Sequence, residues 1–233
     1  MTAKLNSVTI SIPAYNEEKN IPLVVEKSIE VLNKITDDYE IVIINDGSID
    51  NTGNVARELA KNNPRIKVYH HQTNQGIAQT LKEVFLKPTK EWVFFIPGDG
   101  QIPPEEIFKL LPKTHDFDFI LGKRAHRKDN FIRRLNARIY NTVISILAGE
   151  KVTDVDSVAL YKRSILADHC FIARSAFIHA EIFIYVKRNK FRSIEVEIAH
   201  QPRIYGTGTG NNIGVILKTA LDLIRLFVLK PLK

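Results

Sequence analysis

The chain has 233 residues, a formal net charge of +7, 44% hydrophobic residues and 25% charged residues. This length and balance are typical of one large globular domain, and they exclude a fibrous or intrinsically disordered protein. The single cysteine, Cys170, excludes an intrachain disulfide and a cysteine-rich metal site. The positive charge suits an anionic partner such as a nucleotide or a phospholipid surface, but it equally fits a protein with many solvated lysines.

The first half of the chain alternates short β-branched runs with segments of helical periodicity. Strands are expected at residues 8–12, 39–45, 66–69 and 91–96, with helices at residues 21–32, from Asp50 or Asn51 to Leu59, and at 77–85. The second half is less regular, with strands expected at residues 117–121, 157–161 and 192–198 and helices at 131–147 and 181–189. The alternation predicts an α/β fold with a mostly parallel sheet and helices on both faces.

The most informative local feature is the end of the fourth predicted strand, where an apolar run stops at Pro97-Gly98-Asp99-Gly100-Gln101. Open parallel sheets bind ligands just outside the carboxyl ends of their strands, which is where Asp99 is expected. The flanking glycines would let a bulky anion and its metal approach the backbone, and Gln101 adds a neutral oxygen. The alternative is an ordinary strand followed by a tight turn.

Polar loops also follow the first three predicted strands. Tyr15 offers an aromatic face on which a base can stack, and Glu17 adds an acid, although acids at this position also suit a helix start. Asp46 is expected to project beside Asp99, with oxygens that suit the N–H of a base. Gly76 lies in a loop of small residues. Such a loop would let the start of a helix approach a ligand, but ordinary turn chemistry explains it equally well.

Two common nucleotide-binding motifs are absent. The first predicted strand is not followed by a GxGxxG turn, and the chain contains no GxxxxGK string, which argues against a Rossmann dehydrogenase and a P-loop enzyme. The glycine-rich residues 206–210 come late in the chain and are interpreted as a flexible loop over the site. Asp50 is interpreted as a helix cap.

Several of these motifs, in this order, resemble the family 2 glycosyltransferases of GT-A fold, and most closely their dolichol-phosphate mannosyltransferase-like branch. The resemblance rests on residues 11–17, 45–50 and 98–101, and it continues through residues 122–124, 180–181 and 200–206. It therefore covers nearly the whole chain. It implies a GT-A fold with a Rossmann-like, mostly parallel central sheet.

The resemblance also implies roles for individual residues. Pro13, Tyr15, Glu17 and Asp46 would hold the nucleotide of a sugar donor, and Asp99 and Gln101 would bind Mg²⁺ or Mn²⁺ on its diphosphate. We add Gly76 and Asp99 to the expected donor contacts and count Asp99 as catalytic through its metal.

One position departs from the family pattern. Many relatives carry Asp-x-Asp at the fourth strand, whereas Pro97 stands here in place of the first acid. The cation would then be held by Asp99, Gln101, water and the donor phosphates. The departure also leaves open a noncatalytic homologue that binds sugar nucleotides without turnover.

The expected acceptor site is basic. Arg124, Arg133 and Arg203 are predicted to bind a phosphate, because guanidinium groups do so bidentately. Arg134 and Arg138 join them as candidates, and a solvated basic face is the alternative reading for the helical arginines. Relatives carry arginines in the motifs of Arg124 and Arg203, and we count Arg124 as catalytic.

A phosphate acceptor is already ionised and needs no strong base, whereas a hydroxyl acceptor requires one. Glu181 matches an acid of a later family motif and is the expected catalytic carboxylate. Asp154 or Asp156 aligns less securely with a family aspartate, because Val158-Ala159 departs from the surrounding pattern. Either aspartate instead fits a cap or turn.

The sequence from residue 213 to 229 is nearly all apolar, but Lys218, Asp222 and Arg225 share one helical stripe. The charges argue against a membrane span and favour a helix that lies in the membrane interface. The alternative is a helix packed on its own domain. We therefore predict a GT-A domain at residues 1–210 and an amphipathic helix at residues 211–233.

The sequence leads to one main hypothesis. The chain is predicted to be an inverting, metal-assisted glycosyltransferase that moves a sugar from a UDP- or GDP-hexose to polyprenyl or dolichyl phosphate. Expected partners are the two substrates, the membrane surface, and a membrane protein or a second copy of the chain, without nucleic acid. The absence of a secretory signal before Pro13 predicts a cytoplasmic location at the inner membrane face. A family 2 enzyme that glycosylates a saccharide hydroxyl, with Glu181 or Asp156 as base, is the rival enzyme.

Overall fold

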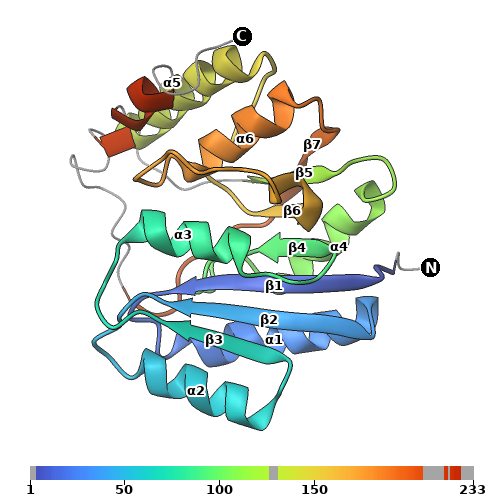
Figure 1. Ribbon diagram of the computed structural model, residues 1–233, viewed down its shortest axis with the longest axis vertical. Helices are drawn as coiled ribbons and strands as arrows, with labels where there is room; N and C mark the ends of the chain where they lie inside the picture. Colours follow the sequence, from blue (N-terminus) through green and yellow to red (C-terminus); the bar gives the residue numbers. More distant parts are fainter. Residues whose placement is uncertain (1–3, 126–130, 207–217, 220, 227–233) are drawn as a thin grey trace.

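The computed structural model describes residues 4–125, 131–206, 218–219 and 221–226, without the side chains of residues 131–133. A seven-stranded sheet in the order β3-β2-β1-β4-β6-β5-β7 forms the centre of the fold (Figure 1). Its strands are β1 (Ser7–Ala14), β2 (Asp38–Asn45), β3 (Ile66–His70), β4 (Trp92–Phe95), β5 (Phe119–Arg124), β6 (Ala159–Lys162) and β7 (Ser193–Ile198). The α-helices are α1 (Asn20–Ile35), α2 (Thr52–Asn62), α3 (Ile77–Leu86), α4 (Ile107–Leu110), α5 (Phe131–Ala148) and α6 (Ile178–Arg188). Short 3₁₀ turns occupy Pro104–Glu106, Leu111–Lys113 and Arg163–Leu166.

The sheet is mostly parallel, as the alternation of strands and helices predicts. β6 is the exception, because it pairs antiparallel with both β4 and β5. The other pairs, β1 with β2, β1 with β4, β2 with β3, and β5 with β7, are all parallel. The fold class predicted from the sequence is confirmed.

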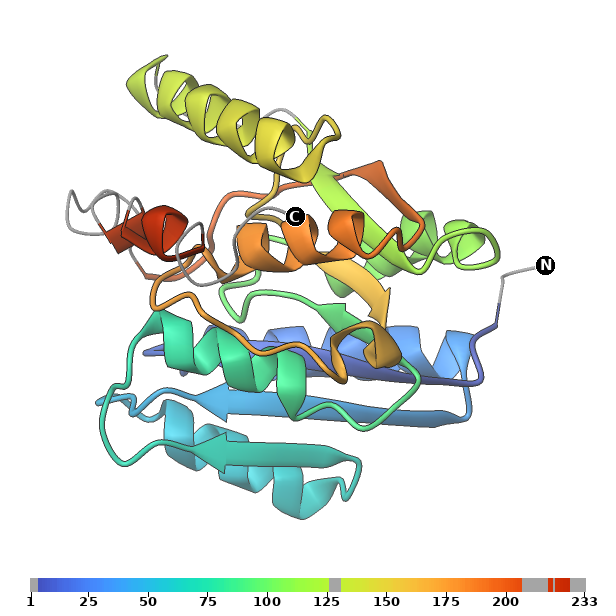
Figure 2. The same ribbon diagram turned by 45° about the horizontal axis from the view of Figure 1, so that its top comes forward.

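Both faces of the sheet are covered, and each has its own apolar core. Alternate residues of β4 show this arrangement: Trp92 and Phe94 pack with α1, α2 and α4, whereas Val93 and Phe95 pack with α3, α5 and α6. Figures 1 and 2 show the two helix layers on opposite sides of the sheet. Burial on both faces explains why these strands read as continuous apolar runs in the sequence.

The strand register brings three loops to one edge. Ala14 at the end of β1 is level with Asn45 at the end of β2, and Ser11 pairs with Phe95 at the end of β4. The Asp46 N–H donates to the Ala14 carbonyl oxygen at 2.9 Å. Gly98 packs so closely on β1 that a Cβ there would lie 2.6 Å from the Pro13 carbonyl oxygen.

Some boundaries differ from the sequence prediction. β5 begins at Phe119 rather than at residue 117, and α6 begins at Ile178 rather than at residue 181. The turn of α4 was not predicted, because four residues are too few for a periodic signal. Among the described residues, no helix is both long and apolar enough to cross a membrane.

Gly47 should be the least replaceable glycine of this edge. It has φ +62°, and an added Cβ would lie 2.3 Å from the Thr73 carbonyl carbon, which belongs to the backbone. Gly149 has a similar φ of +71° but open space around it. We expect Gly149→Ala to lower the free energy of unfolding by about 1 kcal/mol through backbone strain alone, and Gly47→Ala by about 3 kcal/mol or more. Urea unfolding measures both, and equal losses would contradict the role given to the Thr73 contact.

Candidate active site

The predicted donor-side residues meet at the carboxyl edge of β1, β2 and β4. Tyr15 is 41% exposed in the loop after β1, and a clasp between two loops holds this segment. The Asn16 N–H donates to the Ser48 hydroxyl at 3.0 Å, and the Ile49 N–H donates to the Asn16 side-chain oxygen at 3.0 Å. The loops after β1 and β2 are therefore fixed to each other, and an aromatic face remains open to solvent.

Asp46 is buried and organises the loop before α3. Its Oδ1 accepts from the Gln75 N–H and faces His71 Nδ1, both at 2.7 Å. Its Oδ2 accepts from the Gly76 N–H at 3.1 Å. Since a carboxylate oxygen has two lone pairs, Oδ2 retains acceptor capacity beyond this one bond. The structure thus brings the predicted residues Asp46 and Gly76 into direct contact.

Arg203 links two acids of this edge. Its Nη2 forms an ion pair with the Glu17 carboxylate, and its Nη1 lies 3.8 Å from Asp99 Oδ2. Arg203 Nε also donates to the Tyr205 carbonyl oxygen at 2.6 Å. Burial raises the pKa of Glu17 above its usual value, although hydrogen bonds from Asn20 and Arg203 oppose the rise. Arg203 was predicted to bind the acceptor phosphate. In the structure it lies against Glu17, a predicted donor contact, and Asp99, a predicted metal ligand.

The predicted metal ligands are oxygen donors of the right kind. Asp99 Oδ1 accepts from the Gln101 N–H at 3.0 Å, and the Gln101 amide Nε2 lies 3.5 Å from the Gln201 carbonyl oxygen. Within the described part of the chain, no three His, Cys, Asp or Glu side chains cluster as a metal site. The oxygen atoms of Asp99 and Gln101 fit a hard divalent cation that takes its other ligands from diphosphate and water.

Arg124 lies at the end of β5, on the same side of the sheet, in a bidentate pair with Asp154. Its Nε donates to Asp154 Oδ2 at 2.8 Å and its Nη2 donates to Oδ1 at 2.6 Å. Burial and the Arg124 charge lower the pKa of the neighbouring His179 to about 4, so this ring is neutral at neutral pH. Asp154 is thus the partner that orients Arg124, a role that the sequence did not reveal.

The other arginines of the predicted acceptor site lie on α5. Arg134 and Arg138 are exposed on this helix. The side chain of Arg133 lies outside the described residues. Asp156 is exposed and lies beside α5. Burial is the largest cause that raises the pKa of Tyr140 on this helix, and Asp156 and Asp222 raise it further. Asp156 is therefore near the C-terminal helix rather than the donor loops.

Glu181 lies apart from the donor loops, in the first turn of α6. It is only 2% exposed, and its oxygens accept from the N–H groups of Ile172 and Ala173, both at 2.8 Å. His169 Nε2 lies 3.3 Å from Oε1. These contacts tie the segment before α6 to the helix, so the geometry favours a structural role for this carboxylate.

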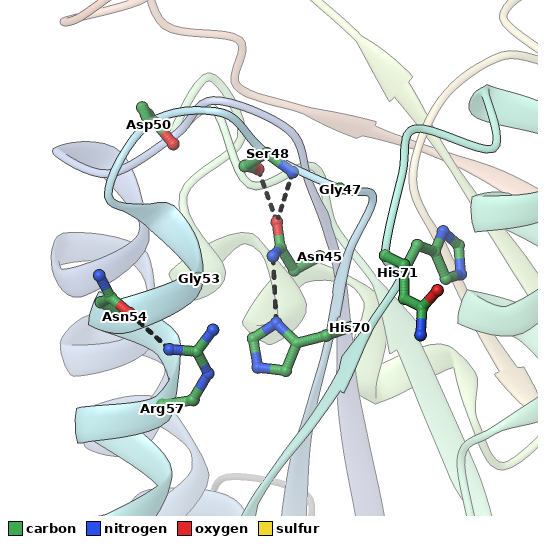
Figure 3. Close-up of a pocket in the computed structure, with 10 residues that line it drawn as sticks. Asn45, Gly47, Ser48, Asp50, Gly53, Asn54, Arg57, His70 and His71 are labelled. Carbon is green, nitrogen blue, oxygen red and sulfur yellow. Dashed lines mark hydrogen bonds between the residues drawn. The ribbon is translucent and has the colours of Figure 1, made fainter.

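A cavity of about 420 Å³ lies beside this edge, between α2 and the end of β3 (Figure 3). Its lining includes Asn45, Ser48, Arg57 and His70, but not Asp46 or Asp99. Figure 3 shows His70 directed toward the cavity and His71 directed away from it. The cavity therefore shares the loop after β2 with the edge where the predicted donor residues meet, and His71 is also part of its lining.

Sequence reasoning missed His71 and Glu83. His71 Nε2 lies 3.1 Å from Glu83 Oε1 on α3, while its Nδ1 faces Asp46. The only sequence feature that could have suggested His71 as a site residue is its position just after a strand. Glu83 lies within an amphipathic helix and gives no signal of its own.

Comparison with known proteins agrees with this fold. Residues 9–175 match the model of the glycosyl transferase family 2. An undecaprenyl-phosphate 4-deoxy-4-formamido-L-arabinose transferase of Proteus mirabilis is 28% identical over 99% of this chain and 70% of its own length. The transferase of the same name from Yersinia enterocolitica is 27% identical with the same coverage.

Solved structures show the same architecture. Glucosyl-3-phosphoglycerate synthase of Mycobacterium tuberculosis in complex with phosphoglyceric acid superposes with a TM-score of 0.74 and 15% identity, covering 94% of this chain and 79% of that one. The same synthase in complex with Mn²⁺, UDP and glucosyl-3-phosphoglycerate superposes with a TM-score of 0.72, 15% identity and the same coverage. The fold is thus that of the GT-A glycosyltransferases. The chain belongs to glycosyl transferase family 2, and it is a glycosyltransferase.

The contacts of Glu181 give a test of its role. Glu181→Gln replaces one buried acceptor oxygen with an NH₂ that opposes a backbone N–H, so we expect a loss of about 2 kcal/mol in the free energy of unfolding. Urea unfolding measures this loss. The fully folded variant should keep turnover within about tenfold of the wild type, and its pH–rate profile should keep its shape. Wild-type stability combined with a hundredfold loss of turnover would instead identify Glu181 as a base.

Proposed function

We propose that this enzyme transfers a sugar from a UDP-linked donor to the phosphate of a polyprenyl lipid at a membrane surface. The observation that carries the proposal is the joint placement of Tyr15, Asp46 and Asp99 at one sheet edge, with Arg124 on the same edge. The names of the relatives support the acceptor class, because both transferases described above are named for undecaprenyl phosphate.

The donor side supports a uridine nucleotide. Tyr15 offers an open ring on which a base stacks, and Asp46 Oδ2 offers an acceptor for a base N–H. The solved structures with UDP and Mn²⁺ or Mg²⁺ share this fold, which favours UDP over GDP as the first donor to test.

Asp99 and Gln101 would hold Mg²⁺ or Mn²⁺ on the donor diphosphate. When bound, the cation supplies positive charge that stabilises the leaving diphosphate. Arg203 adds a second positive charge beside Asp99. This arrangement explains how a chain with Pro97 in place of an acid still neutralises a diphosphate.

Transfer to a phosphate acceptor requires little of the protein beyond orienting that phosphate. A phosphate monoester oxygen is already nucleophilic, so it attacks the anomeric carbon as the bond to the diphosphate oxygen breaks, and a single displacement inverts that carbon. Arg124, oriented by Asp154, and Arg203 are the proposed phosphate contacts, with Arg133 added from the sequence. The buried position of Glu181 favours this acceptor over a saccharide hydroxyl, which would need a base.

Two helices support contact with the membrane. In the C-terminal helix, Asp222 is 1% exposed and accepts from the Arg174 N–H at 2.8 Å and from Arg225 Nη1 at 2.7 Å. Leu221 and Ile224 of the same helix are 52% and 56% exposed. Asp222 therefore faces the domain, whereas the apolar Leu221 and Ile224 face outward together with the exposed Lys218.

The exposed side of α5 has the same character. Leu135, Ile139 and Ile146 are 45%, 56% and 74% exposed, and their spacing places them along one stripe of the helix. The exposed arginines Arg134 and Arg138 lie on the same helix. An apolar stripe with basic neighbours suits an anionic lipid surface, where the acceptor phosphate resides.

The assignment is tested by a transfer assay with UDP-sugars and undecaprenyl phosphate in detergent. We expect sugar transfer that requires the lipid phosphate. Transfer to a free saccharide without the lipid would favour the rival enzyme, and donor binding without turnover under any divalent cation would favour a noncatalytic homologue.

Asp99→Asn should lower turnover by about a hundredfold or more, because the amide loses the charge that holds the cation. The exposed Asp116→Asn is the matched control and should keep wild-type activity. Calorimetry should show that Mn²⁺ strengthens UDP binding in the control but not in Asp99→Asn. Unchanged cation dependence in Asp99→Asn would remove Asp99 from the metal site.

Ile139→Asp and Ile224→Asp should each weaken binding to vesicles containing anionic phospholipid by about tenfold or more, because each places a charge on the apolar surface. Leu86→Asp is the control, since Leu86 is 53% exposed on α3. Vesicle co-sedimentation measures the binding, and circular dichroism checks the fold. Equal binding by all three variants would disprove a membrane role for these helices.

A further inference from the structure

His71 lies between two carboxylates from different elements. Its Nδ1 is 2.7 Å from Asp46 Oδ1 at the end of β2, and its Nε2 is 3.1 Å from Glu83 Oε1 on α3. The neutral Gln79 side chain also donates to Glu83 Oε1, at 2.9 Å. His71 is largely buried, with a side chain 10% exposed.

This geometry requires a proton on both ring nitrogens. Each nitrogen faces an oxygen that only accepts, so either neutral tautomer would direct a lone pair at a carboxylate. Burial lowers the pKa of His71, but hydrogen bonds from the ring to Asp46 and Glu83 outweigh burial and raise this pKa above its usual value. His70, the adjacent residue, is directed to the other side of the strand, where burial and Arg57 lower its pKa (Figure 3).

The imidazolium completes the set of donors to Asp46. Oδ1 already receives the Gln75 N–H and Oδ2 receives the Gly76 N–H, so His71 is the further donor that fixes the rotation of the carboxylate. The Asp46 oxygen with spare acceptor capacity is Oδ2, which turns with Oδ1. A change at His71 therefore reaches the atom that would accept a base N–H.

We propose that His71 is a positioning residue for donor recognition: held as an imidazolium between Glu83 and Asp46, it aligns the carboxylate that accepts the imide N–H of the uracil ring. The inference rests on the proposed function, because it takes Asp46 as the group that reads the base. His71 itself does not contact the donor. Its effect should be on affinity and base discrimination rather than on the chemical step.

The test compares binding of UDP with binding of N3-methyl-UDP, which lacks the imide N–H. The wild type should prefer UDP by about tenfold, the effect of one well-formed hydrogen bond to a charged group. His71→Leu should lose most of that preference. His71→Asn should keep most of it, because an asparagine amide N–H takes the place of Nδ1–H as the donor to Asp46.

The pH dependence separates this role from simple packing. As pH rises through the raised pKa of His71, the ring loses one proton, and the preference for UDP should fall in part, because only the neutral tautomer that lacks Nδ1–H no longer donates to Asp46. Glu83→Gln removes one carboxylate, so the fall should move to lower pH, and His71→Leu should show no such fall. Because uracil itself ionises in alkaline solution, the comparison is made between variants on the same pH scale.

Asp46→Ala distinguishes failure of this inference from failure of the proposed function, because it removes both acceptor oxygens. If Asp46→Ala abolishes the preference for UDP but His71→Leu and Glu83→Gln retain the wild-type preference and pH profile, the role of His71 is wrong and the donor site stands. If the wild type shows no preference, or Asp46→Ala keeps it, Asp46 does not read the base and both proposals are overturned. Thermal unfolding and turnover of His71→Asn and His71→Leu complete the test, since a purely structural role would lower stability without changing base preference.

Discussion

The parallel register of β1 with β2 and with β4 is the constraint on which the rest of the site depends. It places the ends of β1 and β2 level with each other and the end of β4 level with Ser11 of β1, so the loops that follow the three strands share one edge. Gly98 secures this arrangement, because any side chain there would strike the Pro13 carbonyl oxygen and separate β4 from β1. Apolar burial on both faces holds the register, since a shift by one residue would exchange the two faces of each strand. The polar loops themselves contribute little to that burial, and this leaves their side chains available for ligands.

Charge at this edge is balanced between elements that are far apart in the chain. Glu17 and Asp99 come from the loops after β1 and β4, and Arg203 reaches both from the segment after β7. Burial raises the pKa of Glu17, and the Asn20 amide and the Arg203 guanidinium oppose this rise by favouring the charged carboxylate. A diphosphate with its cation brings both signs of charge to the same place, and the existing pairs must then rearrange. The edge is therefore electrostatically suited to a charged ligand.

The C-terminal helix shows how tertiary contacts change the meaning of a helical pattern. Lys218, Asp222 and Arg225 form a polar stripe that in an isolated helix would face water. In the structure Asp222 is buried and accepts from a backbone N–H and from Arg225, whereas Lys218 is exposed, so one charged residue of the stripe packs on the domain while the apolar Leu221 and Ile224 are exposed. The sequence alternatives, packing on the domain or lying in the membrane, are therefore compatible: the helix packs through Asp222 and Leu226, and its other side remains apolar.

The sequence by itself determined the α/β class and most strands and helices, because buried parallel strands and the loops after them carry strong local patterns, and it predicted which loop residues lie at the carboxyl edge of the sheet. The motif residues Tyr15, Asp46 and Asp99 could be found in this way, since Tyr15 and Asp46 follow β1 and β2 directly and Asp99 lies in the loop after β4. The sequence did not reveal the antiparallel placement of β6, the pairing of Arg124 with Asp154, or the Glu83–His71–Asp46 chain. Each of these depends on contacts between segments distant in sequence, and such contacts are chosen by the packing of whole elements rather than by local periodicity. The tertiary structure likewise decided that Glu181 is buried against backbone N–H groups, a position that its sequence motif alone could not distinguish from an open catalytic one.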